Sequence, residues 1–237
     1  MKKLPVFLLT LGLLLGLTAC KEEEPDPVLT LVQGNLDAVY LGTADDSYKA
    51  LTGLTAEDCS AAYLDNLAAE ARYFLSYYGY SDEGLDEDTF HQIELLYQDL
   101  YQHAAYTVGP AAQLDEETQA VKVQITPLTL FALAETDTEL REELFAPIQK
   151  TYYWINLETT DWSNPAIYAY NRYYAQCRTE CVAAQVALCR AQLDKLAEAE
   201  PAEPRTVVVQ VYWHPYGYWT IDDTDWKTVD SLMIEYP

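Results

Sequence analysis

The strongest constraint on the fold is a pair of strand–turn–strand patterns that lie far apart in the chain. In one of them, Arg205 to Trp213 alternates its two faces, and a turn at 214–217 leads into a partner strand at 218–221. In the other, residues 106–113 and 119–126 flank an acidic turn. A lone hairpin is only marginally stable in water. We therefore expect both hairpins to form one small antiparallel sheet with helices packed on one face.

Segments with apolar residues at steps of three or four surround both hairpins and predict helices. The predicted helices cover 28–41, 55–79, 86–104, 138–156, 164–200 and a short segment capped by 222–225. Pro147 is expected to bend the fourth helix, and Pro165 is expected to begin the fifth and longest one. Residues 42–53 are predicted to be a broken connector.

The order of elements is therefore helices, hairpin, helices, hairpin and a short helix, which defines the class α+β. We assign residues 28–237 to one α+β domain, since about 210 residues fit one domain or two small ones. The pattern repeats in two halves, 28–127 and 128–237. No convincing residue identity accompanies this repeat, so it is a repeat of pattern alone.

Residues 1–19 have the parts of an export signal. Lys2 and Lys3 supply a positive start, an apolar run extends from Leu4 to Leu17, and small residues follow. The apolar run of roughly 14 residues is short for a membrane-spanning helix, which needs about 20. The leader therefore predicts that the rest of the chain is exported from the cytoplasm.

The end of this leader, Leu17-Thr18-Ala19-Cys20, resembles the bacterial lipobox. The resemblance implies that Cys20 is lipidated on its sulfur and becomes the first residue of the mature protein. Bacterial lipoproteins carry a diacylglycerol, and stable anchoring takes more than one acyl chain. The resemblance predicts a lipid-anchored protein on the extracytoplasmic face of the cell membrane. The alternative is an ordinary secretory signal in which the cysteine is incidental.

The acylated Cys20 is followed by a charged, proline-containing stretch, and we predict that residues 20–27 form an acidic linker. The whole chain has a formal net charge of −24, and loss of Lys2 and Lys3 with the leader leaves 12 basic against 38 acidic residues. Such a surface repels nucleic acid and anionic lipid heads, which excludes nucleic acid as a partner. The membrane would be contacted through the lipid anchor.

Four further cysteines would lie outside the cytoplasm, where disulfides can form. They are Cys59, Cys177, Cys181 and Cys189. Cys177 and Cys181 share a helix face, but helical geometry does not favour a bridge between them, whereas Cys59 could reach one of the three. Their spacing fits no zinc motif. We favour small apolar packing residues over a metal site, and the pairing stays open.

Few residues have the pattern of a catalytic site. His91, His103 and His214 are candidates for acid–base work, but no nucleophile–histidine order accompanies them. Asp222 and Asp223 could bind calcium or act on a glycan, although a strand end followed by a helix cap explains them better. The chain has no glycine-rich phosphate loop. We therefore predict no catalytic residue, no metal site and no cofactor.

Tyrosine is the most unusual component, with 20 residues beside five Trp and five Phe. Consecutive tyrosines on a helix cannot all face one core, so some must lie partly exposed. Most of them are expected to fill half-buried seams between helices and sheet. The group around the turn at 214–217 is the best candidate for an exposed ligand surface of sugars, peptides or proteins. Its members are Trp213, Tyr216, Tyr218 and Trp219.

The chain as a whole resembles lipoproteins of Gram-positive bacteria that carry a small α+β domain of cystatin or NTF2-like shape. The resemblance rests on the lipobox, on the helix-then-hairpin order and on the ending Tyr218-Trp219-Thr220-Ile221-Asp222 before a helix. Only the lipobox is a specific motif. The resemblance implies no particular activity, because that group has none in common.

Three function classes follow from these observations. The first is a tethered, non-enzymatic binding or accessory module that uses an aromatic cleft for a glycan, peptide or protein ligand. The second is an extracytoplasmic hydrolase of glycan or peptide, which requires two carboxylates in one pocket about 5–10 Å apart. The third is a structural or stress lipoprotein of the envelope with a filled core and no small ligand. The absence of catalytic motifs favours the first class.

Overall fold

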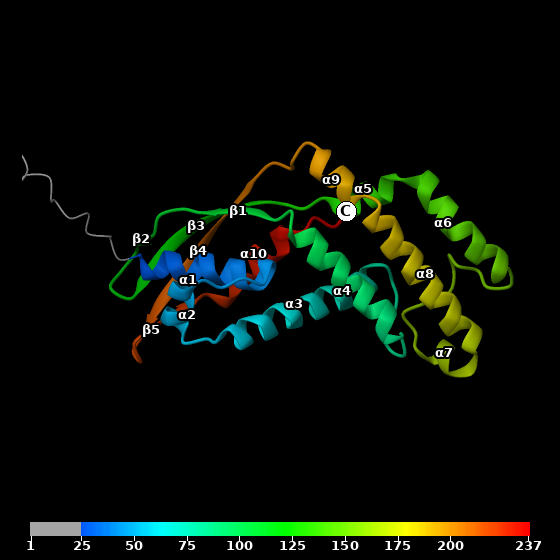
Figure 1. Cartoon of the computed structure of the whole chain (residues 1–237), viewed down its shortest axis with the longest axis horizontal. Helices are drawn as coiled ribbons and strands as arrows, with labels where there is room; N and C mark the ends of the chain where they lie inside the picture. The colour runs from blue at the N-terminus through cyan, green and yellow to red at the C-terminus, as the bar shows by residue number, and fades with distance from the viewer. Residues whose placement is uncertain (1–24) are drawn as a thin grey trace, which may run out of the picture.

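The computed structural model describes residues 25–237, apart from the side chains of Ala169 and Tyr170. The predicted signal peptide and the lipidated Cys20 therefore lie outside the described residues. Figure 1 shows an elongated molecule in which the sheet occupies one end and a group of helices occupies the other.

The sheet is antiparallel and unites both hairpins, as predicted. Its strand order is β1-β3-β4-β5, and the short β2 also pairs with β3. The central contact joins the hairpins, with Val121 opposite Val209 and Val123 opposite Val207. The strands are β1 (Ala105–Val108), β2 (Ala112–Gln113), β3 (Thr118–Thr126), β4 (Arg205–His214) and β5 (Tyr218–Ile221).

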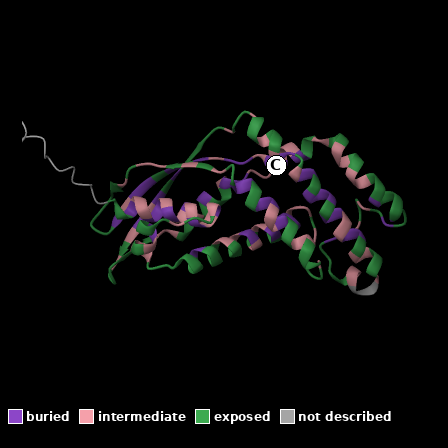
Figure 2. Ribbon diagram, in the orientation of Figure 1, coloured by how far each residue is buried: buried purple, intermediate pink, exposed green. Residues whose placement is uncertain are grey.

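One face of the sheet is covered and the other faces solvent. Val121, Val123 and Ile125 are buried on β3, whereas the intervening Lys122 and Gln124 are exposed. Helices α1 (Pro27–Leu36) and α10 (Asp223–Met233) contact the central strands. Figure 2 shows the buried residues along the strands and the inner sides of the helices. The α+β class with helices on one face is confirmed.

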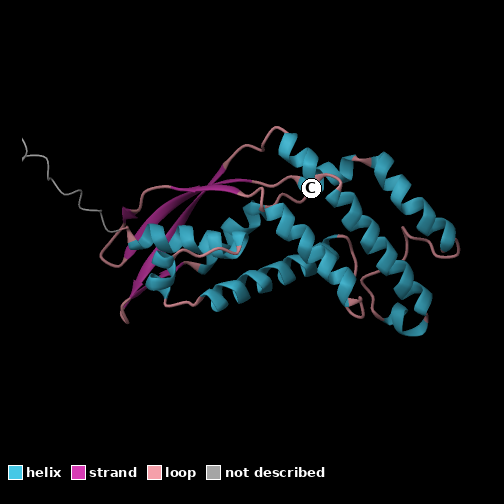
Figure 3. Cartoon of the chain, in the orientation of Figure 1, coloured by secondary structure: helices cyan, strands magenta, loops and turns pink. Residues whose placement is uncertain are grey.

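Most of the remaining helices extend the molecule away from the sheet, whereas α2 (Asp46–Thr52) packs on α1 at the sheet end. Figure 3 shows that the strands are confined to one end. A second hydrophobic cluster, which includes Ile148, Trp162 and Cys181, lies among the far helices. These elements are η2 (Asp37–Leu41, a π-helical turn), α2 (Asp46–Thr52), α3 (Ala56–Tyr77), α4 (Glu87–Tyr101), α5 (Leu130–Thr136), α6 (Thr138–Thr151), α7 (Ala166–Tyr170), α8 (Arg172–Arg190) and α9 (Leu193–Glu198).

The predicted caps are present where short polar side chains precede apolar stripes. Thr55 and Asp58 form a reciprocal capping box at the start of α3. Asp86 accepts from the Thr89 amide at 2.9 Å and begins α4. Asp222 accepts from the amides of Thr224 and Asp225 and begins α10. Asp222 is thus a helix cap, as the sequence favoured.

The capping box supports a first testable prediction. Replacement of Thr55 by alanine removes the hydroxyl that accepts from the Asp58 amide at 3.1 Å. The free energy of unfolding should fall by about 1 kcal/mol, measured by urea denaturation. Ser60→Ala is the matched control, because Ser60 is exposed within the same helix. Equal stability of both variants would contradict a stabilising cap at Thr55.

Three predictions about helix extent were wrong. The single helix expected over 164–200 is divided into α7, α8 and α9, so α3, with 22 residues, is the longest helix within residues 25–237. Asn171 has an extended backbone, and its side chain accepts from the Tyr173 amide, which begins a new helix there. Near the second break, the Gln192 side chain donates to Asp137 at 3.1 Å. The helix expected over 138–156 ends at Thr151.

Two connecting segments also differ from prediction. The region 42–53 contains α2, which the Asp45 side chain caps and which ends at Gly53 with a left-handed φ of 72°. The predicted linker 20–27 ends earlier than expected. Asp26 accepts from the Val28 amide at 2.9 Å, and Pro27 is the first residue of α1.

Candidate functional site

The four predicted ligand residues lie together at the tip of the β4–β5 hairpin, and we call them the hairpin patch (Trp213, Tyr216, Tyr218 and Trp219). Trp213 pairs across the strands with Trp219, and their ring centroids are 5.1 Å apart. His214 stacks on Tyr218 at 4.6 Å and on Tyr216 at 5.0 Å. The exposed fractions are 85% for Tyr216, 49% for Tyr218 and 39% for Trp213. Trp219 is half-buried and packs against the core, so three of the four side chains show the expected exposure.

A shallow groove of about 580 Å³ lies against the hairpin patch. Trp213, Tyr218 and Trp219 line it together with Pro27, Leu51 and Glu116. Pro27 is the first residue of α1, so the groove adjoins the end of the domain nearest the predicted anchor. Figure 1 shows the start of α1 at the same end of the molecule as β5. The groove thus combines exposed aromatic rings with a carboxylate, a combination that suits sugar or peptide contacts.

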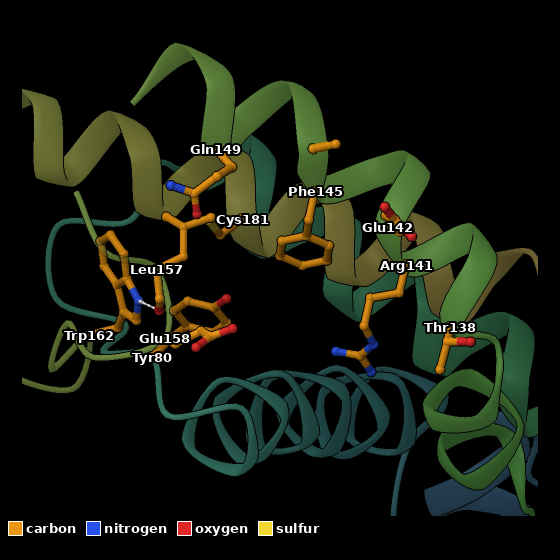
Figure 4. Close-up of a pocket in the computed structure, with 11 residues that line it drawn as sticks. Tyr80, Thr138, Arg141, Glu142, Phe145, Gln149, Leu157, Glu158, Trp162 and Cys181 are labelled. Carbon is orange, nitrogen blue, oxygen red and sulfur yellow. Dashed lines mark hydrogen bonds between the residues drawn. The ribbon is translucent and has the colours of Figure 1, made fainter. Parts of the chain in front are cut away.

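A second, more enclosed cavity of about 460 Å³ lies in the helical end of the molecule (Figure 4). Arg141 and Phe145 point into it from α6, and Cys181 reaches it from α8. The Trp162 indole donates to the Leu157 carbonyl at 3.0 Å, so this ring presents an apolar face to the cavity. The sequence did not predict this cavity, because its lining comes from four separate segments.

A third pocket, of about 240 Å³, brings together two carboxylates. Tyr101 donates to Glu70 at 2.6 Å, and Tyr40 donates to Asp230 at 2.9 Å. Burial raises the pKa of Glu70 to about 7; the Tyr101 hydrogen bond opposes that rise and the Asp230 charge adds to it. Glu70 and Asp230 lie far apart in the sequence, and no local pattern could have joined them.

The three histidines do not form a site. His91 lies in the first turns of α4, where its Nδ1 is 3.0 Å from Glu94. His103 follows the C-terminal end of the same helix, and His214 belongs to the β4–β5 hairpin. Within residues 25–237, no aspartate, glutamate or cysteine side chain contacts two of the histidines.

The four cysteines of the described chain are buried free thiols. Cys177 and Cys181 interact on one face of α8, which lowers the pKa of Cys177 and raises that of Cys181. Within residues 25–237, no three His, Cys, Asp or Glu side chains are grouped as metal ligands. All four cysteine side chains are buried within the two hydrophobic clusters.

One aromatic surface was not foreseen as a unit. Tyr153, Trp154 and Tyr173 are 77%, 52% and 42% exposed. The ring centroids of Trp154 and Tyr173 are 6.1 Å apart, although the two residues belong to different segments. Tyr153 and Trp154 lie about twenty residues before Tyr173 in the sequence, and only the folded chain brings the two segments together.

Among the described residues, none of the helices has the length and apolar character needed to cross a membrane.

Comparisons with known proteins bear on the fold. No protein-family model matches the chain, and no curated protein matches its sequence. The structure is similar to that of ycdA, a candidate lipoprotein from Bacillus subtilis, with a TM-score of 0.56 and 12% identity. The likeness covers 89% of this chain and 56% of ycdA, so this chain spans little more than half of that relative and shares its fold.

Proposed function

We propose that this protein is a membrane-tethered extracytoplasmic lipoprotein that acts as a non-enzymatic binding module of the cell envelope. Two independent observations support the tether. The leader ends in Leu17-Thr18-Ala19-Cys20, which has the lipobox pattern. The fold is shared with a Bacillus subtilis chain that is itself named as a candidate lipoprotein. The cystatin or NTF2-like resemblance remains a prediction.

The observation that carries the binding role is the exposed hairpin patch beside its groove. Large aromatic rings are seldom left exposed side by side without a partner, and aromatic side chains dominate the energetic centres of binding surfaces. The Trp213 and Trp219 rings form one wall, and Glu116 supplies a hydrogen-bond acceptor. A glycan or an extended peptide fits this mixture of stacking surface and carboxylate better than an anionic polymer, which the acidic surface repels.

The position of the groove limits where its ligand lies. Pro27 lines the groove and is separated from Cys20 by the residues 21–26. A chain of that length spans no more than about 25 Å when fully extended. The groove is therefore held close to the membrane surface, and its ligand belongs to the membrane-proximal layer of the envelope.

Binding through the hairpin patch is tested by Trp219→Ala. The full-length protein in lipid nanodiscs is screened against cell-wall glycans and peptidoglycan fragments, with empty nanodiscs as the blank. Affinity for the ligand so found should fall roughly 30-fold, because loss of a central aromatic contact costs about 2 kcal/mol or more. Trp154→Ala is the matched control, since Trp154 is exposed on a different surface. An equal loss in both variants, or none in either, would contradict the assignment.

A second function is favoured by one observation. Glu70 and Asp230 line the same pocket, and Glu70 has a pKa of about 7, as a general acid requires. Carboxylate-based hydrolysis of a glycan or peptide would then depend on Glu70. Both carboxylates are, however, already engaged by buried tyrosines, and this favours the binding role. Release of reducing sugar or new amino termini from envelope substrates, lost in Glu70→Gln, would establish the hydrolase instead.

A further inference from the structure

The cavity in the helical end contains an arginine without a protein partner. Five of the six arginines have one: Arg72 lies near Asp82, Arg172 near Tyr173, Arg178 near two carbonyls, Arg190 near Asp99, and Arg205 near Glu235. Within residues 25–237, Arg141 has no hydrogen bond or ion pair from its side chain. Arg141 thus differs from the other five arginines in having neither an ion pair nor a hydrogen bond within residues 25–237, although its side chain is half-buried.

The geometry places this charge inside the cavity. Arg141 lies in α6, one turn before Phe145, and Figure 4 shows both side chains pointing into the same space. Burial raises the pKa of the Tyr80 hydroxyl, and the Arg141 charge acts against that rise, so the guanidinium is near this wall of the cavity. Glu142 and Glu158 also line the cavity, and both side chains are exposed to solvent.

The rest of the lining is largely apolar. Tyr80, Phe145, Leu157 and Trp162 supply rings and a branched side chain, and the Trp162 indole N–H is already bonded to Leu157. The volume of about 460 Å³ lies within the roughly 300–1,000 Å³ that is usual for small-molecule sites. An apolar wall with a small number of polar or charged groups is the usual composition of such sites.

We propose that this cavity binds a small organic monoanion, a carboxylate with an apolar or aromatic body. The guanidinium of Arg141 holds the carboxylate through paired N–H donors, which match its geometry. The rings of Phe145 and Trp162 cover the body of the ligand. The exposed Glu142 and Glu158 repel molecules with several negative charges, so a phosphate-rich ligand is disfavoured. This site is separate from the hairpin patch and does not depend on the proposed function.

The proposal is tested with three probes of one shape, 4-phenylbutyrate, 4-phenylbutanamide and 4-phenylbutylamine. Binding to the full-length protein in lipid nanodiscs is measured by isothermal titration calorimetry, with empty nanodiscs as the blank. The carboxylate should bind at least about tenfold more tightly than the amide, because its hydrogen bonds to arginine are charged. The amine should bind least tightly of the three beside Arg141.

Two variants test the contact to the carboxylate and the contact to the apolar part of the ligand separately. Arg141→Gln should lower the affinity for the carboxylate to that for the amide and leave the amide unchanged. Phe145→Ala should weaken both by the same factor. Arg172→Gln is the control, because Arg172 is exposed and lies outside the cavity lining. Equal affinities of carboxylate and amide for the unmodified protein, no binding of any probe, or a carboxylate preference that survives in Arg141→Gln would each overturn the proposal.

Discussion

Cells that express a Cys20→Ser variant and grow with labelled palmitate are expected to yield a protein without label. Lipidation of a lipoprotein forms a thioether, and a serine hydroxyl at the same position cannot supply the sulfur. The unmodified protein should carry the label and sediment with membranes, since each buried CH₂ of an acyl chain adds about 0.8 kcal/mol to membrane binding. The body offers no electrostatic substitute, because its strongly acidic surface is repelled by anionic lipids.

The control for this experiment is Cys59→Ser. Cys59 is a buried thiol of the folded domain, so its loss should leave both label and sedimentation unchanged. Label is a better measure than sedimentation alone, since an unprocessed leader could itself hold the variant at the membrane. Retention of label by Cys20→Ser, or its absence from the unmodified protein, would remove the tether and with it the membrane-proximal position of the groove.

The parts of the fold that the sequence predicted are those set by local periodicity. The alternation around Val121 and Val209 established which face of each strand is covered, and a polar cap before a stripe established where α3 begins. The breaks at Asn171 and Gln192 were not predicted, because both residues are compatible with a helix. Whether the helix continues at these two positions depends on side-chain hydrogen bonds, such as that from Gln192 to Asp137. The α2 helix was missed because it is shorter than the pattern needed to recognise it.

The candidate sites divide in the same way. Exposure of Tyr216 and Tyr218 follows from a turn that the sequence shows directly. The neighbouring Pro27 and Leu51, which complete the groove, come from the opposite end of the chain and required the fold. The cavity around Arg141 was also beyond prediction. An arginine in a charged helix is expected to pair with a neighbouring glutamate, and only the structure shows that Arg141 does not.

Glu70→Gln is expected to make the protein more stable at pH 8 and to have little effect at pH 4.5. Burial raises the pKa of Glu70 from 4.5 to about 7 in the folded protein. Between these values the folded state binds more protons than the unfolded state, so Glu70 makes stability fall as pH rises through this window. At pH values above this window, the buried negative charge lowers the stability of the folded protein by its full amount. Each pKa unit corresponds to 1.36 kcal/mol, and partial solvent access lowers the total, so we expect a gain of about 1–3 kcal/mol.

The measurement is urea denaturation of both proteins at pH 4.5 and pH 8. The informative quantity is the difference in unfolding free energy between Glu70→Gln and the unmodified protein at pH 8, minus the same difference at pH 4.5. Comparison at matched pH is necessary because the whole acidic surface also loses repulsion as pH falls. Asp65→Asn is the control, since Asp65 is exposed on the same helix and should change stability little at either pH. A glutamine can still accept the hydrogen bond from Tyr101, so the substitution removes the charge and keeps the contact. If Glu70→Gln were no more stable than the unmodified protein at pH 8, the carboxylate would be stabilised as an anion by its surroundings. Glu70 would then be excluded as a general acid, and the hydrolase function with it.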